Sequence, residues 1–158
     1  MAEILHPRVF LVVVDESEEL QVAVHYAARR AAHTGGRVAL LYVIEPSEVQ
    51  PWLAIENLAR EEQREQAEHL IQRLCEEISP IAGSVPIVYI REGSRRDELL
   101  ALIEEEPSIS ILVLAAGTGP EGPGPLISYL TGKPAARLRI PITIVPGGLT
   151  VGELDAVS

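Results

Sequence analysis

The sequence has few cysteines, few aromatic residues and few positive charges, and these shortages exclude several classes of protein. Its one cysteine, Cys75, excludes an internal disulfide and a cysteine-built zinc site, and it fits a reducing compartment. Lys and Arg number 13 against 23 Asp and Glu, for a formal net charge of -10, and no basic stripe is visible. Because such a surface repels a polyphosphate backbone, we expect no nucleic-acid partner.

A long hydrophobic run is also absent. No apolar segment approaches the ~20 residues that span a bilayer, and the first ten residues lack the basic-then-apolar order of a secretion signal. We therefore expect a cytoplasmic protein with no membrane partner. The 158 residues, 47% of them hydrophobic, fit one folded domain, which we place at residues 1–147. Residues 148–158 are polar, contain glycine and lack a strong period, so we expect a flexible C-terminal tail.

Short apolar segments typical of buried strands recur along the chain. They are rich in β-branched residues and bounded by polar residues, glycine or proline, as strands buried on two faces are. The segments are 9–14, 38–44, 85–90, 109–116 and 140–145. Pro141 and Pro146 indicate that the last of them lies at a sheet edge.

Segments with helical spacing of apolar residues separate these strands. They are 17–34, ended by Gly35 and Gly36; 55–79, ended by Pro80; 94–106, ended by Pro107; and 126–138, interrupted at 132–134. Strands that alternate with helices predict an open α/β fold, with a mostly parallel sheet and helices on both faces.

Two features follow predicted strands at their carboxyl ends, where open α/β sheets bind ligands. Asp15 comes directly after the first strand, where it can contact a ligand, cap the following helix, or do both. A loop rich in glycine and proline follows the fourth strand, and Gly119, Gly122 and Gly132 have the spacing G-x-x-G-x9-G. Glycine suits a phosphate loop because backbone N–H groups must approach the phosphates closely. Pro134 is well placed to begin a short helix.

This glycine spacing, the V-V-V-D end of the first strand and the final I-P-I-T-I-V-P strand resemble the universal stress protein family. The resemblance covers nearly the whole chain. It implies a fold like that of the adenine-nucleotide hydrolases, with an open five-stranded parallel sheet in the order 3-2-1-4-5. It also implies a stress-response protein that binds ATP or AMP as a regulatory ligand at the C-terminal rim of the sheet, and a homodimer through the last strand, Ile140 to Val145.

By this resemblance, Val13, Asp15 and Val43 line the nucleoside side of the pocket. The residues around ribose and phosphates are Gly119, Gly122, Gly132 and Lys133. The nucleotide site predicted in this way consists of Val13, Asp15, Val43, Ala116, Gly119, Gly122, Gly132 and Lys133. The chain departs from the family pattern at Lys133, where nucleotide-binding members usually carry Ser or Thr. Three prolines of the loop also remove N–H donors, which weakens the phosphate cradle. Arg91, Arg95 and Arg96 either reach the rim or pair with glutamates of the second predicted helix.

Two further functions stay open beside regulatory nucleotide binding. One is a nucleotide-free dimeric module that recruits an unknown protein, and the other is a slow ATPase in which Asp15 holds magnesium. We predict no catalytic residue, because no general base is visible. The glycines at 117–122 also match a dinucleotide fingerprint, but they follow the fourth strand rather than opening the first βαβ unit. The four histidines lack the spacing of a metal site.

Overall fold

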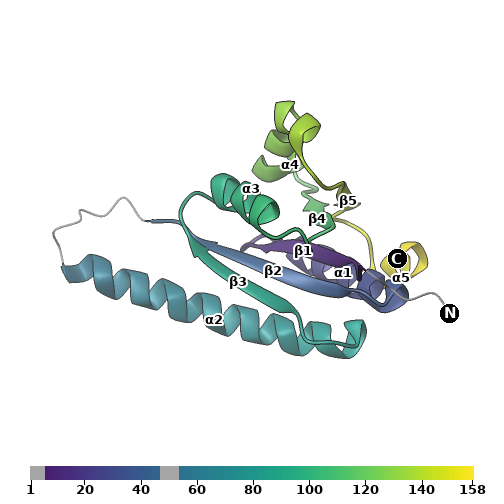
Figure 1. Cartoon of the computed structure of the whole chain (residues 1–158), viewed down its shortest axis with the longest axis horizontal. Coiled ribbons are helices and arrows are strands. Elements are labelled where there is room, and N and C mark those ends of the chain that lie inside the picture. Colours follow the sequence, from purple (N-terminus) through teal and green to yellow (C-terminus); the bar gives the residue numbers. More distant parts are fainter. Residues whose placement is uncertain (1–5, 47–53) are drawn as a thin grey trace.

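The structure, a computed structural model, describes residues 6–46 and 54–158, except for the side chains of residues 54–57. Part of the N-terminal segment considered above therefore lies outside the described residues. The strands are β1 (Val9–Val14), β2 (Arg37–Ile44), β3 (Ile87–Glu92), β4 (Ile111–Ala116) and β5 (Ile142–Pro146). The helices are α1 (Leu20–Thr34), α2 (Ala54–Ala82), α3 (Arg95–Glu105), α4 (Pro125–Leu130), the 3-10 helix η1 (Lys133–Arg137) and α5 (Val151–Val157) (Figure 1).

All five strands form one parallel sheet in the order β3-β2-β1-β4-β5. This confirms the predicted fold class and strand order. β1 pairs with β2 on one side and with β4 on the other, so the strand order reverses between β1 and β4. In open α/β sheets this switch point leaves a crevice beyond the carboxyl ends of the two strands.

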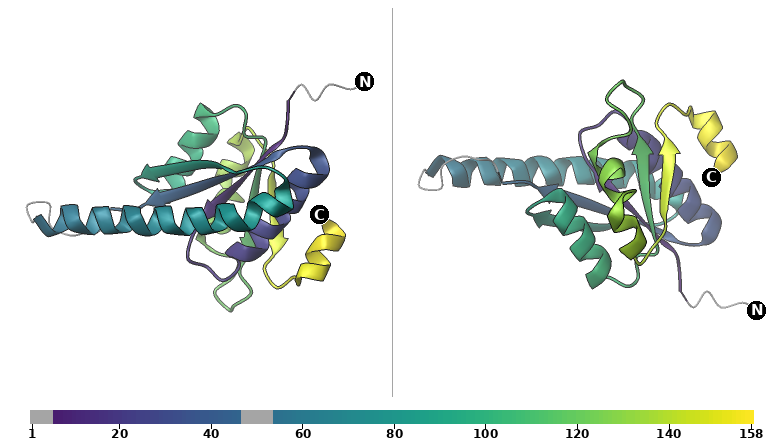
Figure 2. Two further views of the ribbon diagram at one scale, coloured as in Figure 1. Left: turned by 90° about the horizontal axis from the view of Figure 1, so that it is seen from below. Right: turned by 90° about the horizontal axis from the view of Figure 1, so that it is seen from above.

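Helices cover both faces of the sheet, and the alternation of side chains along β1 divides the core between them. Phe10, Val12 and Val14 pack with α1 and α2, whereas Leu11 and Val13 pack with α3 and α4. Figure 1 shows the long helix α2 below the sheet and α3 and α4 above it, and Figure 2 shows the molecule from below and from above. None of the helices among the described residues is long and apolar enough to cross a membrane.

Several element boundaries differ from the predicted ones, and two of them have a clear local cause. The prediction that Pro80 ends the second helix is wrong, because α2 continues to Ala82 and stops before Gly83, whose φ is +85°. A proline near the end of a helix removes few hydrogen bonds, and the left-handed glycine then supplies the stop. β3 begins at Ile87 rather than at Val85, because Pro86 has no N–H to donate to β2.

The C-terminal segment is folded where the sequence predicted a flexible tail. Thr150 and Glu153 form a capping box: Thr150 Oγ1 accepts from Glu153 N and Glu153 Oε1 accepts from Thr150 N, both at 3.2 Å. Leu154 of α5 is 2% exposed and belongs to the core on the α1 side of the sheet. Asp155 Oδ1 and His25 Nε2 form a hydrogen bond of 2.8 Å. The segment after β5 therefore contains a helix docked on α1.

Candidate functional site

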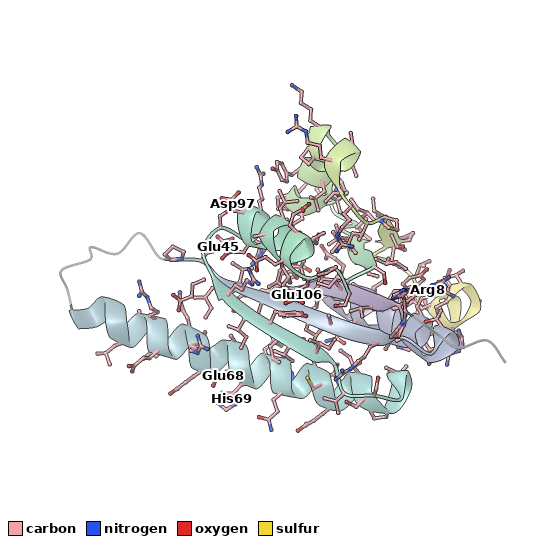
Figure 3. All side chains as sticks on the ribbon, in the orientation of Figure 1. Arg8, Glu45, Glu68, His69, Asp97 and Glu106 are labelled. Atoms are coloured by element: carbon pink, nitrogen blue, oxygen red, sulfur yellow. The ribbon has the colours of Figure 1, made fainter. Side chains whose placement is uncertain are left out.

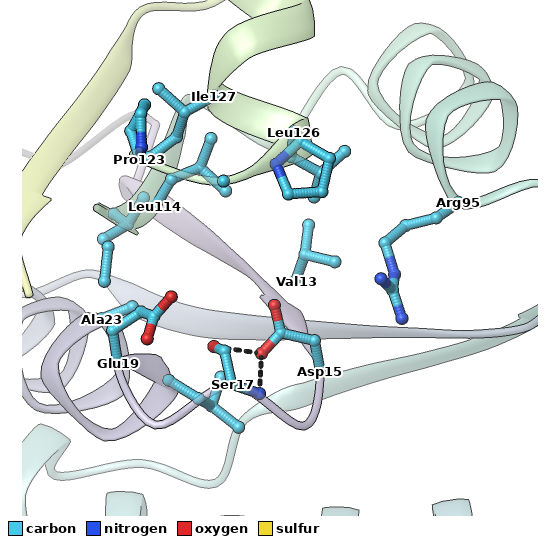
Figure 4. Close-up of a pocket in the computed structure, with 15 residues that line it drawn as sticks. Val13, Asp15, Ser17, Glu19, Ala23, Arg95, Leu114, Pro123, Leu126 and Ile127 are labelled. Carbon is cyan, nitrogen blue, oxygen red and sulfur yellow. Dashed lines mark hydrogen bonds between the residues drawn. The ribbon is translucent and has the colours of Figure 1, made fainter. Parts of the chain in front are cut away.

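A cavity of about 110 Å³ opens at the switch point, between the carboxyl ends of β1 and β4 (Figure 4). We call it the β1–β4 cavity. Val13 and Leu114, the inner residues of the two strands, contribute apolar surface, and residues 123–127 close the cavity from the side of α4. The polar wall comes from the turn between β1 and α1, which supplies Asp15 and Glu19.

Asp15 is fixed by the turn that follows β1. Its Oδ1 accepts from Ser17 N at 2.9 Å and from Ser17 Oγ at 2.5 Å, which closes an Asx turn. The N-terminal capping position of α1 is Glu19, without a side-chain hydrogen bond, so the alternative in which Asp15 caps this helix is not realised. Asp15 Oδ2 makes no hydrogen bond to the described part of the chain. This oxygen is free to accept a hydrogen bond from a ligand.

Glu19 brings a second carboxylate to the cavity and packs against two glycines. A Cβ on Gly117 would lie 3.2 Å from Glu19 Oε1, and one on Gly147 would lie 3.1 Å from Glu19 Cβ. The Cβ on Gly147 would also lie only 2.1 Å from the carbonyl oxygen of Ala116. The rim is therefore tightly packed at this corner, and Asp15 and Glu19 make it acidic.

Arg95 supplies a positive charge on the opposite side of the cavity from Glu19 (Figure 4). It is the first residue of α3, and its Nε is buried without a hydrogen-bond partner among the described residues. Arg91 instead pairs with Glu105 of α3 at 2.6 Å, and this hydrogen bond raises the pKa of Arg91. The Arg96 guanidinium lies 4.4 Å from the centre of the Tyr129 ring. Of the three arginines considered from the sequence, Arg95 is the one in the cavity.

Arg95 also lines two other hollows. One, of about 160 Å³, lies between the start of α3 and the start of α4 and includes Arg96. The other, of about 260 Å³, lies along the end of β2 and includes Val43 and Glu45; we call it the β2 hollow. Arg95 therefore lines all three hollows.

The predicted nucleoside residues line two of these hollows. Val13 and Asp15 line the β1–β4 cavity, and Val43 lines the β2 hollow. Ala116 ends β4 beside them without lining either, and its carbonyl oxygen accepts a hydrogen bond of 3.0 Å from Gly147 N.

The predicted phosphate residues are spread more widely. Gly119 and Gly122 lie in the loop just before the cavity-lining residues 123–127, and Gly122 N donates to Gly119 O at 3.2 Å. Gly122 has a φ of +89°, and a Cβ on either glycine would meet nothing within 4 Å. Gly132 directly precedes η1, which begins at Lys133 with Pro134 as its second residue rather than its first, and Lys133 lines a separate groove between α3 and η1. The structure thus brings the first two glycines, but not Lys133, near the cavity.

Sequence reasoning missed the contributions of Ser17 and Glu19 to the cavity. Both follow the first strand within the same rim segment as Asp15, so the rule that identified Asp15 was a usable signal for them as well. Among residues 6–46 and 54–158, no group of three or more His, Cys, Asp or Glu side chains could hold a metal ion.

Comparison with known proteins agrees with this fold. The model of the universal stress protein family matches residues 7–146. Universal stress protein UspA from Lactobacillus plantarum is similar in structure, with a TM-score of 0.75 and 18% identity over 89% of this chain and 98% of that one. So is the universal stress protein from Archaeoglobus fulgidus in complex with dAMP, with a TM-score of 0.61 and 15% identity over 90% and 99% of the two chains.

A universal stress protein in complex with cAMP is also similar, with a TM-score of 0.50 and 20% identity over 89% of this chain and 98% of that one. No curated protein sequence matches the chain. Because the family model covers most of the length and the sheet has the order expected for it, this chain belongs to the universal stress protein family.

Proposed function

We propose that this protein binds an adenine nucleotide, ATP or AMP, as a regulatory ligand at the carboxyl rim of its sheet. The observation that carries the proposal is the β1–β4 cavity, which lies at the switch point and is bordered by Asp15 and the glycine-rich loop. Two family members in complex with dAMP and with cAMP support an adenine nucleotide as the ligand class.

In this proposal the nucleoside contacts Val13 and Asp15 and extends past Arg95 toward Val43. The β1–β4 cavity of about 110 Å³ is smaller than the roughly 300 Å³ of a typical ligand pocket, so the ligand also needs the neighbouring hollows. Asp15 Oδ2 would accept a hydrogen bond from a ribose hydroxyl or the adenine amine. Arg95, with its unpartnered Nε, would donate to a phosphate.

Backbone N–H groups of the loop at Gly119 and Gly122 would meet the phosphates, with Ala116 at the end of β4 beside them. Gly132 and Lys133 would join this site only through a movement of the segment after α4, because Lys133 faces another groove. Glu19 opposes anionic charge in the cavity, so we expect the site to favour AMP over ATP unless a cation accompanies the triphosphate.

Calorimetric titration of the nucleotide-stripped protein with AMP, ATP with magnesium, and GTP tests the proposal. The informative variant is Gly119→Ala, because its methyl group meets nothing in the free protein and its backbone is not left-handed. The methyl group would block the close approach of a phosphate, and we expect at least a tenfold loss of affinity, about 1.4 kcal/mol. Gly152→Ala in α5 also meets nothing within 4 Å and is the matched control.

Saturable binding of adenine nucleotides that is weakened by Gly119→Ala and unchanged by Gly152→Ala is the expected result. No heat with any nucleotide, together with no change in thermal stability, would refute nucleotide binding. Equal affinities for the wild type and Gly119→Ala would place the phosphates elsewhere.

A nucleotide-free dimeric interaction module is the second candidate, and the exposed edge of the sheet favours it. β5 is an edge strand with 42% of Ile144 exposed, and an unpaired edge of this kind can pair with a second copy. We propose a homodimer through this strand. Ile144→Lys should lower the molar mass measured by light scattering from that of a dimer to that of a monomer. A monomeric wild type at all concentrations would refute this candidate.

A further inference from the structure

A groove separate from the sheet rim lies between α3, α4 and η1, and we call it the α3–η1 groove. Its volume is about 320 Å³, and none of its lining residues also lines the β1–β4 cavity. The apolar part of the lining consists of Leu100, Ile103, Tyr129 and Leu138, together with Pro134. Lys133, Arg137 and Glu104 supply its charges.

The groove exists because the helix after the glycine-rich loop is broken. α4 ends at Leu130, Gly132 precedes η1, and Pro134 prevents an α-helical hydrogen bond across the break. η1 has no buried residue, so this part of the chain packs loosely against its neighbours and leaves α3 partly uncovered. In Figure 1 the segment of α4 and η1 projects away from the sheet next to α3.

The floor of the groove is continuous with the hydrophobic core. Ile103 is 1% exposed and belongs to the core on this face of the sheet, and Leu100, Tyr129 and Leu138 pack against that core while partly exposed. The Tyr129 ring is held by the guanidinium of Arg96, 4.4 Å from its centre. The apolar wall is therefore formed before any ligand arrives.

Two cations of the groove have no ion-pair or hydrogen-bond partner among the described residues. Lys133 is the only lysine of the sequence, and neither it nor Arg137 forms an ion pair or hydrogen bond with the described residues. Glu104 is the one carboxylate of the lining. On a chain with a net charge of -10, the groove is thus a local site with more positive than negative charge.

We propose that the α3–η1 groove is a second binding site, for a small amphipathic carboxylate such as a medium-chain fatty acid. The apolar tail would lie on the partly exposed side chains of Leu100, Tyr129 and Leu138, where it removes apolar surface from water. The carboxylate would pair with Arg137, whose fork of N–H groups fits two oxygens, and with Lys133 as a point charge. The volume of about 320 Å³ falls within the range of roughly 300–1,000 Å³ for small-molecule pockets.

The single lysine makes the test direct. Reductive methylation with ¹³C labels Lys133 and the N-terminal amine only, so one side-chain NMR signal reports on the groove. Decanoate below its micellar concentration is the probe, and decanamide is the uncharged probe with the same tail. We expect decanoate to shift the Lys133 signal saturably. Decanamide should bind at least about tenfold more weakly than decanoate, because it lacks the charge.

Arg137→Gln removes one cation of the groove from an exposed position, so the fold should be retained. Arg73→Gln in α2 is the matched control, since it removes the same charge from an exposed position outside the groove. We expect Arg137→Gln to weaken decanoate binding about tenfold and Arg73→Gln to leave it unchanged.

Several results would overturn the proposal. Equal affinity for decanoate and decanamide, or equal effects of the two arginine variants, would exclude recognition of the carboxylate. A Lys133 signal that does not respond would exclude the site, and a response that coincides with a doubling of molar mass would mean that a second copy covers the groove.

Discussion

Replacement of Leu154 by alanine should release α5 from α1 while the sheet stays folded. Leu154 is the one buried side chain of α5, at 2% exposed, and Leu149 adds only a partly buried contact before the helix. The remaining contacts are polar. Asp155 pairs with His25 and Arg29, and the carbonyl oxygen of Ser158 lies 2.8 Å from His33 Nδ1 and accepts from Arg30 at 3.2 Å. Leu154 therefore supplies most of the apolar contact between α5 and the rest of the protein.

The loss of stability in Leu154→Ala depends on two free energies: the cost of removing a buried leucine and the entropy cost of ordering α5. Replacing a buried leucine by alanine in a rigid core costs about 2–5 kcal/mol. Ordering the seven residues of α5 costs about 1–2 kcal/mol each, so the docked helix has little net stability to lose. Once α5 undocks, no further stability is lost, and the global change should therefore lie near the low end, about 2 kcal/mol.

Hydrogen exchange measures the release of α5, and urea unfolding measures the change in the global free energy of unfolding. The amides of Leu154 and Ser158, bonded at 2.8 and 3.0 Å within the helix, should exchange near the rate of an unstructured chain in Leu154→Ala. Amides of β1 should keep most of their protection, because the sheet does not depend on α5. Val157→Ala, at a residue that is 61% exposed in the same helix, is the control and should change little. Equal loss of protection in α5 and β1 would refute the idea that α5 is an independent unit.

Three other outcomes are expected. Gly147→Ala should cost about 1–3 kcal/mol in urea unfolding, because its Cβ would lie 2.1 Å from Ala116 O; an unchanged midpoint would show that this corner relaxes freely. Gly35→Ala should cost ~1 kcal/mol in the same assay, because Gly35 ends α1 at a φ of 67°, and a stabilised variant would contradict this. The hydrogen bond with His25 lowers the pKa of Asp155 below its ordinary value of 3.8, so its contribution to α5 docking is present above that pH and lost as the pH falls through the lowered pKa. Asp155→Asn should remove this acid-dependent loss of α5 protection, and an unchanged pH dependence would exclude Asp155 as its source.

The sheet could be predicted from the sequence because its strands are buried on both faces. Residues 9–14 and 38–44 are continuous apolar runs, a pattern that a two-sided parallel strand requires and that an amphipathic helix does not produce. The ends of the strands were less certain, since Pro86 shortens β3 through a single missing N–H and leaves the hydrophobic pattern unchanged.

The C-terminal helix was missed because its stability is mainly tertiary. Residues 151–157 contain one buried leucine, too few for an apolar period to be visible. The capping box of Thr150 and Glu153 was the one local signal, and it follows the S/T-x-x-E pattern of a helix start. A short helix of this kind forms because α1 offers Leu154 a place in the core and offers Asp155 a histidine partner.

The candidate site shows how far glycine spacing can be used. Spacing along the chain located the loop at the rim, because Gly119 and Gly122 directly precede the residues that line the β1–β4 cavity. Spacing does not determine where a side chain points, and Lys133 lines the α3–η1 groove instead. The difference has a functional consequence, since a lysine outside the cavity cannot replace the hydroxyl group that nucleotide-binding relatives are expected to have after the last glycine. Lys133→Ser should therefore leave AMP affinity unchanged in calorimetry while it weakens decanoate binding, and the opposite result would mean that the segment after α4 moves to the rim when a nucleotide binds.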